Sequence, residues 1–422
     1  MHKWYNCLLL NSRHAIVLFQ LSNTLVPRDL RCPILVDANG MPRYWASVWS
    51  TLSTAQLADS THIKKLRCIE CLYQHADNLL GTSALDNALG SLDDEALSKI
   101  LESWFMSLRN HAAGTKNDEV LWHTGTSFVF SVIAWLSKSA SDDRIRQLER
   151  RLHRLKTLYG QLHVRRTKSI ESIRSLPAGT VEALYALLDP SSDKNPFTRQ
   201  TTRWRIFVAF VLMLHQGLRR GEVLLLPIDA VKSAFDYKKN RTKHWINVRE
   251  NDYENSDVDP RYSKPSIKTT HSIRQIPVSD TTTDIIETYV QNYRGRANHS
   301  YLLNSNTGMP LSTEALTKAF ALVTENLPKQ ALKELKERTG KESVTPHDLR
   351  HTCAVVRLHQ LLQLGDEMPE ALQKLRTFFG WSKTSSMPSR YARAVFEDRL
   401  ANVWNDAFDE RVGLLRSLPK GH

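Results

Sequence analysis

Residues 345–351 read Thr-Pro-His-Asp-Leu-Arg-His and combine a helix start with two side chains suited to an anion. Threonine is a preferred helix N-cap and proline is favoured at the first helical position, so the stretch predicts the opening turn of a helix. His347 and Arg350 are three positions apart and therefore share one face of that turn. Because the first turn carries free N–H groups and the positive end of the helix dipole, we expect this face to suit a phosphate group.

The motif Gly217-Leu218-Arg219-Arg220-Gly221-Glu222 lies upstream, shortly after an apolar stretch. Glu222 follows Arg219 by three positions, so on a helix the two side chains share a face and the carboxylate can hold the guanidinium in place. Arg220 is an alternative candidate, and an ordinary surface pair of arginine and glutamate would give the same pattern. The motif taken alone leaves the choice open.

Three further elements complete an ordered set in the C-terminal half. Lys268 lies in an expected β-hairpin over 263–278. Gly380-Trp381 comes later, and Tyr391 follows Trp381 by ten residues. In this order the five elements resemble the active site of the tyrosine recombinases, also called phage-type integrases. The resemblance covers about residues 175–400 and implies an enzyme that breaks and rejoins a DNA phosphodiester.

The resemblance implies a role for each charged residue of the set. It favours Arg219 over Arg220 and implies that Arg219 and Arg350 neutralise the phosphate in the transition state, with Glu222 in support. Lys268 would protonate the departing 5′ oxygen, and Lys264 is a nearby alternative.

Trp381 and Tyr391 carry the remaining roles. Trp381 occupies the position where the family most often has histidine. An indole only donates hydrogen bonds, so Trp381 cannot act as a base. It could bind a phosphate oxygen or support the tyrosine helix. Tyr391 is the expected nucleophile. Since a free phenol has a pKa of about 10, it needs positive neighbours or a base such as His347.

Such an enzyme is a site-specific recombinase that links Tyr391 to a 3′ phosphate of double-stranded DNA and passes the strand to a partner duplex. The implied assembly is a homotetramer in the synaptic complex, and a monomer or dimer when free, serving integration or excision of a mobile element. No cofactor is expected, because the covalent link conserves the phosphodiester energy. Two alternatives are a type IB topoisomerase-like enzyme that relaxes DNA and a catalytically silent DNA-binding accessory factor.

Two patterns suggest metal binding and are rejected. His347 and His351 have the spacing of the histidines in zinc proteases, with Asp348 in the position of the general base, but that base is normally glutamate and no third ligand follows. Cys68 and Cys71 lack a second ligand pair at zinc-site spacing. We therefore expect no metal site.

The composition agrees with a polyanionic partner. The 422 residues include 57 Lys and Arg against 44 Asp and Glu, a formal net charge of +13. Such a surplus favours nucleic acid. Five scattered cysteines argue against a disulfide framework. The longest apolar run, 206–214, is too short to span a membrane, and no targeting segment is apparent. We expect a cytoplasmic protein associated with the nucleoid.

The first half of the chain predicts a helical DNA-binding domain. Residues 1–45 form an extension of uncertain role, in which Asn39-Gly40 could turn a short hairpin between 34–36 and 44–46. Residues 46–160 are expected to form a helical core-binding domain, with helices beginning near Ser60 and at 93, 119 and 142. A basic linker should cover 161–179. The candidate DNA-binding residues are Lys64, Lys65, Arg150, Arg151, Arg154, Arg165 and Arg166.

The second half, 180–422, predicts the catalytic domain. We expect a buried central helix over 204–215, a short helix over 221–226, and three strands at 244–249, 263–268 and 272–278. Helices should follow to the C-terminus, where Phe396, Leu400, Val403 and Ala407 form an apolar stripe. The predicted fold is mainly α with a small β-sheet, an α+β class in which two domains form a clamp around DNA.

Overall fold

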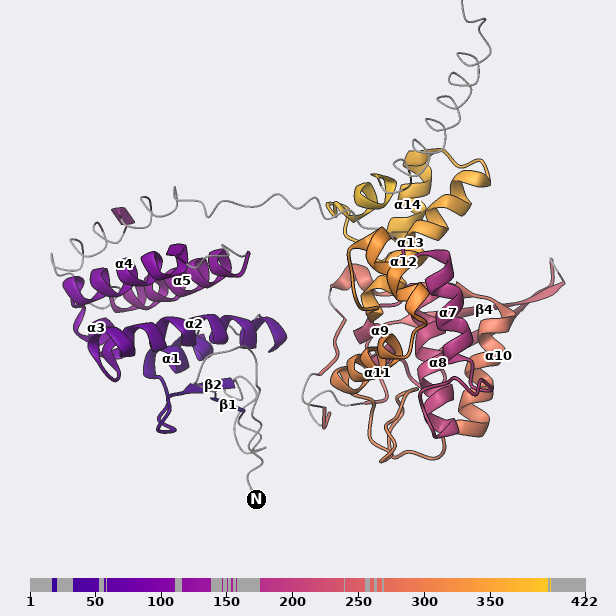
Figure 1. Cartoon of the computed structure of the whole chain (residues 1–422), viewed down its shortest axis with the longest axis horizontal. Coiled ribbons are helices and arrows are strands. Elements are labelled where there is room, and N and C mark those ends of the chain that lie inside the picture. The colour runs from indigo at the N-terminus through magenta and orange to yellow at the C-terminus, as the bar shows by residue number, and fades with distance from the viewer. Residues whose placement is uncertain are drawn as a thin grey trace, which may run out of the picture. The chain divides into compact units, whose positions relative to one another are not determined.

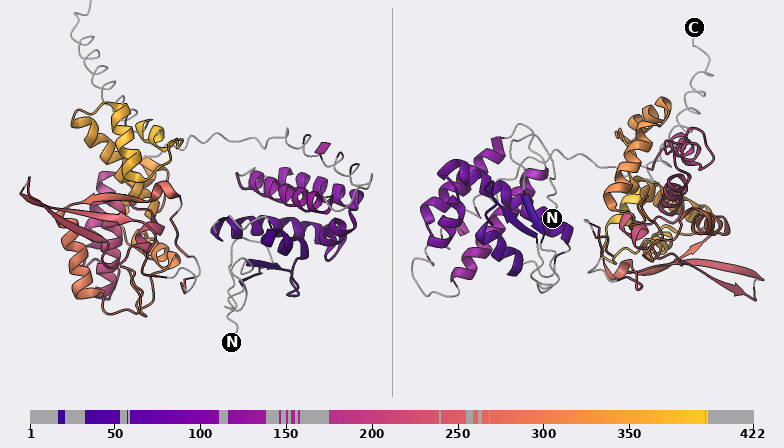
Figure 2. Two further views of the ribbon diagram at one scale, coloured as in Figure 1. Left: turned by 180° about the vertical axis from the view of Figure 1, so that it is seen from behind. Right: turned by 90° about the horizontal axis from the view of Figure 1, so that it is seen from below.

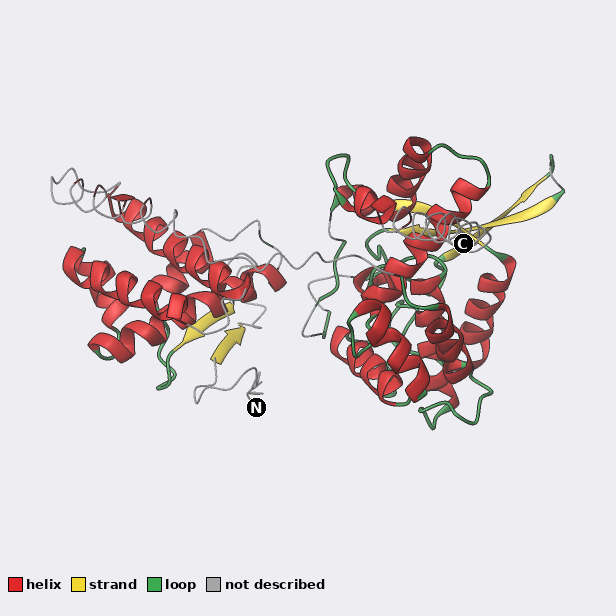
Figure 3. Ribbon diagram, turned by 45° about the horizontal axis from the view of Figure 1, so that its top comes forward, coloured by secondary structure: helices red, strands yellow, loops and turns green. Residues whose placement is uncertain are grey.

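The structure is a computed structural model. It describes residues 17–20, 33–52, 57, 59–110, 116–137, 146, 150, 153, 154, 157 and 175–395, except 239, 255–258, 262, 263, 268 and 394. The described chain is mainly helical with small antiparallel sheets, which confirms the predicted fold class (Figures 1 and 3). It divides into two compact units, Met1–Ser169 and Ile170–His422, and we describe each by itself. None of the described helices has the length and apolarity needed to cross a bilayer.

The first unit packs helices against one short antiparallel sheet (Figure 1). Its elements are β1 (Val17–Gln20), β2 (Pro33–Val36), α1 (Tyr44–Leu52), α2 (Asp59–Leu80), α3 (Ala84–Ser91), α4 (Asp94–Asn110) and α5 (Lys116–Ser137). The apolar stripes predicted for α2 and α4 form its core; Leu66 and Leu97, for instance, are fully buried. Asp93 caps α4 by accepting bonds from the backbone N–H groups of Glu95 and Ala96, at 3.1 and 3.0 Å.

The prediction of a hairpin around Asn39-Gly40 was wrong for its second strand, residues 44–46. The chain does turn there, but residues 44–46 begin α1. Asp86, on α3, accepts hydrogen bonds from the backbone N–H groups of Tyr44 and Trp45 at 2.9 and 3.1 Å. A carboxylate distant in sequence thus satisfies the free donors of the first turn, which local sequence could not show.

The second unit surrounds the buried helix α8 (Figure 1). Its first part contains α7 (Ala178–Leu188), α8 (Gln200–Leu214), α9 (Arg220–Leu225), β3 (Val231–Asp236), β4 (Arg241–Val248), the 3₁₀ turn η2 (Thr270–Ser272) and β5 (Arg274–Val278). Then come α10 (Asp280–Thr288), the π-helical turn η3 (Tyr289–Tyr293), α11 (Thr313–Glu325), α12 (Lys329–Thr339), α13 (Pro346–Gln363) and α14 (Met368–Phe379). Residues 387–393 form a further helical segment.

Helix α8 is buried nearly all round and packs against α13, as predicted for residues 204–215. The basic linker expected over 161–179 is shorter than predicted at its C-terminal end. Leu176 is buried in the core of the second unit, its N–H donates to the Thr352 hydroxyl at 2.9 Å, and α7 begins at Ala178. The rest of the linker lies outside the described residues.

The sheet has the order β3-β4-β5, antiparallel throughout. The strand expected over 263–268 was wrong, since residues 264–267 form no strand and β3, which was not predicted, pairs with β4 instead. Pro265 has no N–H to donate to a ladder. The N–H of Ile267 donates to the Glu250 carboxylate at 2.6 Å instead of to a neighbouring strand.

Candidate active site

Glu222 is the centre of the charged cluster in the second unit. Its buried carboxylate lies 2.5 Å from Nη1 of Arg219, 3.0 Å from Nη2 of Arg274 and 3.7 Å from Nη1 of Arg350. Burial alone would raise the pKa of Glu222, but Arg274, Arg350 and Arg219 lower it to about 2. Glu222 is therefore ionised at neutral pH. Three guanidinium groups around one carboxylate leave a surplus of positive charge for a phosphate.

The predicted contact between Arg219 and Glu222 is confirmed, but its geometry differs from the prediction. Arg219 is the extended N-cap of α9 rather than a residue on the face of a helix. Its backbone N–H donates to Oε2 of Glu222 at 2.9 Å, and its Nη1 also donates to the Ser272 hydroxyl at 3.0 Å. Arg220 donates instead to Thr317 on α11 at 2.6 Å. The structure therefore brings Arg219, and not Arg220, to the carboxylate.

Arg350 is held by backbone oxygens. Its side chain is buried, and it donates to the carbonyl of Gly217 and, at 2.8 Å, to that of Phe379. Burial lowers the pKa of Arg350, as does the charge of Arg219. Gly217 has a φ of +58°, and a Cβ there would lie 2.4 Å from the Phe379 ring. A glycine is thus required where the chain carries its carbonyl to Arg350.

The helix start predicted from residues 345–351 is confirmed. Pro346 opens α13, and the N–H of the N-cap Thr345 donates to Oδ2 of Asp348 at 2.8 Å. Asp348 is also paired with Lys341, so its carboxylate is engaged in capping. His347 is exposed at this turn, next to the ring of His351 at a centroid distance of 4.1 Å.

Tyr391 lies in the helical segment 387–393 with only 1% of its surface exposed. Its hydroxyl is 2.5 Å from Nδ1 of His351. Burial and the neighbouring His347 lower the pKa of His351 to about 4, so this ring is neutral at neutral pH and can accept the hydrogen bond. Burial raises the pKa of Tyr391, while Arg350 and Arg219 act in the opposite direction. His347, the base predicted from the sequence, is not the residue in contact with the tyrosine.

Trp381 supports the tyrosine, as the sequence suggested. The indole is stacked between the rings of Phe379 and Tyr391, at centroid distances of 4.8 and 5.3 Å and interplanar angles of 12° and 13°. The carbon of the Arg350 guanidinium lies 4.8 Å from the Phe379 centroid. The stack therefore connects the end of α14 to Tyr391 and to the buried Arg350.

Sequence reasoning missed Arg274 and the contact of His351 with Tyr391. Arg274 donates to Glu222 and, at 2.7 Å each, to the carbonyls of Phe378 and Ser272. A signal was present, because Arg274 shares a strand face with Ile276 and Val278, which are apolar residues facing the core. A charged residue on such a face needs a partner. For His351 the only signal is its place next to Arg350 in the motif.

The other predicted residues are placed as follows. Four of them lie outside the described residues: the catalytic candidate Lys268, and Arg151, Arg165 and Arg166 from the DNA-binding set. Lys64 is exposed on α2, and Nζ of Lys65 lies 5.9 Å from the centroid of the Trp49 ring. Arg150 and Arg154 are exposed helical positions. The DNA-binding role of this set stays a prediction.

No group of three potential metal ligands occurs among the described residues. Cys68 and Cys71 lie within α2 as free thiols.

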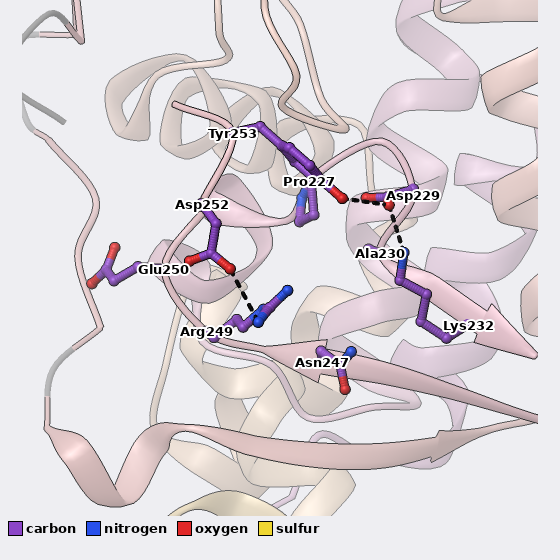
Figure 4. A pocket seen from close by; sticks show the side chains of 9 residues that line it. All are labelled: Pro227, Asp229, Ala230, Lys232, Asn247, Arg249, Glu250, Asp252 and Tyr253. Atoms are coloured by element: carbon purple, nitrogen blue, oxygen red, sulfur yellow. Dashed lines mark hydrogen bonds and ion pairs between the residues drawn. The ribbon is translucent and has the colours of Figure 1, made fainter. Parts of the chain in front are cut away.

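A pocket in the second unit lies between the end of β4 and the residues before β3 (Figure 4). Its lining carries no surplus of positive charge, since Lys232 pairs with Asp229 at 2.5 Å, Arg249 pairs with Asp252 at 3.0 Å, and Glu250 adds a further carboxylate. The surplus positive charge lies around Glu222 and not in this pocket.

Comparison with known proteins places these residues in a family. A sequence model of the phage integrase family matches residues 175–398, more than half of the chain. No curated protein matches the sequence. Among solved structures, the XerH site-specific recombinase bound to a palindromic difH substrate is 14% identical, with 86% of this chain and 93% of that chain covered and a TM-score of 0.46.

Two further solved structures are similar at comparable levels. The lambda integrase(75-356) dimer bound to a COC' core site is 14% identical, with 82% of this chain and 94% of that chain covered and a TM-score of 0.42. The XerA recombinase is 11% identical, with 85% and 97% covered and a TM-score of 0.34. The match to the family model, which spans every element of the candidate site from Arg219 to Tyr391, shows that the chain belongs to the phage integrase family of tyrosine recombinases.

Proposed function

We propose that this recombinase cuts and rejoins double-stranded DNA at specific sites with Tyr391 as its nucleophile. The observation that carries the proposal is the hydrogen bond from the Tyr391 hydroxyl to His351. In this bond the His351 ring is a proton acceptor for the Tyr391 phenol, and the charges of Arg350 and Arg219 also act on that phenol. A phenol needs positive neighbours or a base to attack a phosphate near neutral pH, and Tyr391 has both.

The proposed cleavage step balances its charges and protons through side chains. The Tyr391 oxygen attacks phosphorus while its proton passes to Nδ1 of His351. Arg219 and Arg350 donate to the non-bridging oxygens and stabilise the negative charge of the transition state. The bond to the 5′ oxygen breaks, and Lys268 supplies the proton that this oxygen takes up. The products are a 3′-phosphotyrosyl link and a free 5′ hydroxyl.

Rejoining reverses these transfers. A 5′ hydroxyl attacks the phosphotyrosyl link, the lysine accepts its proton, and the imidazolium of His351 returns a proton to the departing Tyr391 oxygen. Because the covalent link conserves the phosphodiester energy, the proposed cycle uses neither ATP nor a metal ion. Trp381 holds the tyrosine ring by stacking, and its indole N–H is a further candidate donor to the phosphate.

The biological role that we propose is integration or excision of a mobile element, in association with the nucleoid. Four protomers would assemble on two duplexes, and free protein would be monomeric or dimeric. Residues 46–160 would bind the core site, with Lys64, Lys65, Arg150, Arg151 and Arg154 on phosphates. The linker before Leu176, which carries Arg165 and Arg166, would join this domain to the catalytic domain and complete the clamp.

Mapping the covalent junctions would test the proposal. The full-length protein is incubated with fragmented genomic DNA, denatured, and the DNA that stays attached is sequenced. We expect junctions at one shared sequence, attached through Tyr391, and no attachment for Tyr391→Phe. Tyr293→Phe is a matched control, since this ring stacks on Trp204 and lies outside the site.

The same experiment distinguishes the alternatives. Junctions at unrelated sequences, together with relaxation of a plasmid that lacks the shared sequence, would indicate a topoisomerase-like enzyme. Specific binding with no attached DNA would indicate an accessory factor. An adduct that persists in Tyr391→Phe would contradict the assignment of the nucleophile.

A further inference from the structure

Strands β3 and β4 continue as a two-stranded ribbon beyond the edge of the third strand. Strand β5 pairs with β4 only from His244 to Val248. Among the described residues, no further strand pairs with the outer part of the ribbon, where Ala234 faces Lys243, Phe235 faces Thr242 and Asp236 faces Arg241. Figures 2 and 3 show this ribbon projecting from the helices of its unit. Two strands without further cover are marginally stable, so such a projection calls for a partner.

The ribbon is strongly basic. Between 232 and 243 the sequence has five lysines and arginines against one aspartate. Lys243 pairs with Asp236, but Lys238 and Arg241 are exposed, and no ion pair involving either is seen among the described residues. The tip therefore presents cations that are available to an anionic partner.

Two aromatic side chains lie exposed at the same tip. Tyr237 is 87% exposed and Phe235 47%, and their rings meet edge to face at a centroid distance of 5.0 Å. By the strand register, Phe235 lies on the face that further along carries the buried Ile246. The core face of the sheet thus extends outward as an uncovered aromatic surface flanked by lysine and arginine.

We propose that the ribbon of residues 232–243 binds duplex DNA beside the cleavage site, with Lys238 and Arg241 on phosphates and Tyr237 against the groove. A two-stranded ribbon has the width that the major groove admits. Cations neutralise phosphates and release counterions. If the tip carried only the aromatic rings, it would favour a protein partner. Its excess of positive charge favours DNA, which is a polyanion. The inference rests on the proposed function, because it assumes the same DNA.

The sheet itself sets the distance to the site. Val248 pairs with Arg274, which binds Glu222, so this end of β4 lies beside the catalytic cluster. Arg241 lies at the other end of β4, about 23 Å away at roughly 3.3 Å per residue. That length corresponds to about seven base pairs at ~3.4 Å each. The ribbon contact is therefore expected within about seven base pairs of the scissile phosphate.

The test compares two double variants of the full-length protein that lose the same charge. Lys238→Ala with Arg241→Ala removes the cations of the tip. Lys318→Ala with Lys329→Ala removes two exposed cations on α11 and at the start of α12. Binding to a random-sequence duplex is measured against salt, and hydroxyl-radical footprints are recorded on the DNA that the junction mapping identifies.

We expect the ribbon variant to flatten the log-log salt slope by up to about 1.8 units, and the control to leave it unchanged. The ribbon variant should also lose protection at a position within about seven base pairs of the phosphotyrosyl junction. A photo-crosslinking amino acid in place of Tyr237 should label DNA.

Three results would overturn the inference. One is an unchanged slope and footprint in the ribbon variant while the wild type still forms the Tyr391 adduct, a result that leaves the proposed function intact. Another is crosslinking of position 237 to a second copy of the chain instead of to DNA. The third is a wild type that binds no duplex. Conversely, the ribbon variant could flatten the salt slope while the wild-type protein forms no Tyr391 adduct. That pair of results would support the ribbon contact and contradict the proposed function.

Discussion

The Tyr391 hydroxyl lies 2.5 Å from Nδ1 of His351, one residue beyond the arginine of the His-x-x-Arg motif. The proposed nucleophile and its proposed proton acceptor thus meet in the free protein. Because the pKa of His351 is lowered to about 4, the ring is unprotonated at neutral pH and free to take the phenol proton.

His351→Gln should slow cleavage by a factor of about a hundred or more, on the scale of losing a general base. A substrate with sulfur in place of the bridging 5′ oxygen separates the two proton transfers, because a thiolate leaves without an acid. This substrate should restore cleavage to Lys268→Ala but not to His351→Gln. If His347→Gln is impaired on the thiolate substrate and His351→Gln is not, the base is His347.

The stability of the fold should depend on His351 at mildly acidic pH. Its pKa is about 4 in the folded chain and about 6.5 when unfolded, so the unfolded state binds more protons between these values. The contribution is fully present above pH ~6.5 and is lost as the pH falls toward ~4. Thermal unfolding measured across this window should show a weaker pH dependence in His351→Gln. The change in slope is compared with that of His359→Gln, which removes an exposed histidine from the same helix.

Arg274→Ala should destabilise the second unit by about 3 to 5 kcal/mol, because it leaves Glu222 buried with one partner fewer. Arg249→Ala, which breaks an exposed pair with Asp252, should cost no more than about 1 kcal/mol. Urea unfolding of the two variants checks the difference. Equal losses would mean that Arg274 is not anchored by the carboxylate.

Arg219→Ala should act mainly on the reaction. Its side chain is 25% exposed, so truncation leaves room for water beside Glu222 while a transition-state charge is lost. We expect single-turnover cleavage to slow by a factor of about a hundred or more. Arg220→Ala is the matched control and should cleave at nearly the wild-type rate, since Arg220 is directed to Thr317. If Arg220→Ala slowed cleavage more than Arg219→Ala, then Arg220 and not Arg219 would be the arginine that stabilises the transition state.

Cleavage should proceed in excess EDTA, because the proposed charge stabilisers are all side chains. The measurement is adduct formation after dialysis against the chelator, with and without added divalent ions. An absolute requirement for a divalent ion would revive the metal interpretation of His347 and His351.

The parts of the site that were predictable from sequence are those fixed by local geometry. Thr345-Pro346 favours a helix start through local geometry alone, and the position of Arg350 on the first turns follows from that helix. Strand β3 and the partner of Arg274 depend on tertiary pairing instead. Strand β3 forms because β4 offers it an edge. The alternation of Arg274 with Ile276 and Val278 signals that it needs a partner, but Glu222 is 52 residues away in sequence. The error at 263–268 has a local cause as well, since Pro265 removes a ladder donor that the β-branched pattern concealed.

The carboxylate of Glu222 has a consequence for the entropy of substrate binding. A free arginine side chain samples many rotamers, and ordering it around a phosphate costs on the order of 2 kcal/mol. Here Arg219, Arg274 and Arg350 are already held by Glu222 and by backbone oxygens in the free protein. Their rotamer freedom is surrendered once, when the chain folds, and is not lost again at each encounter with DNA.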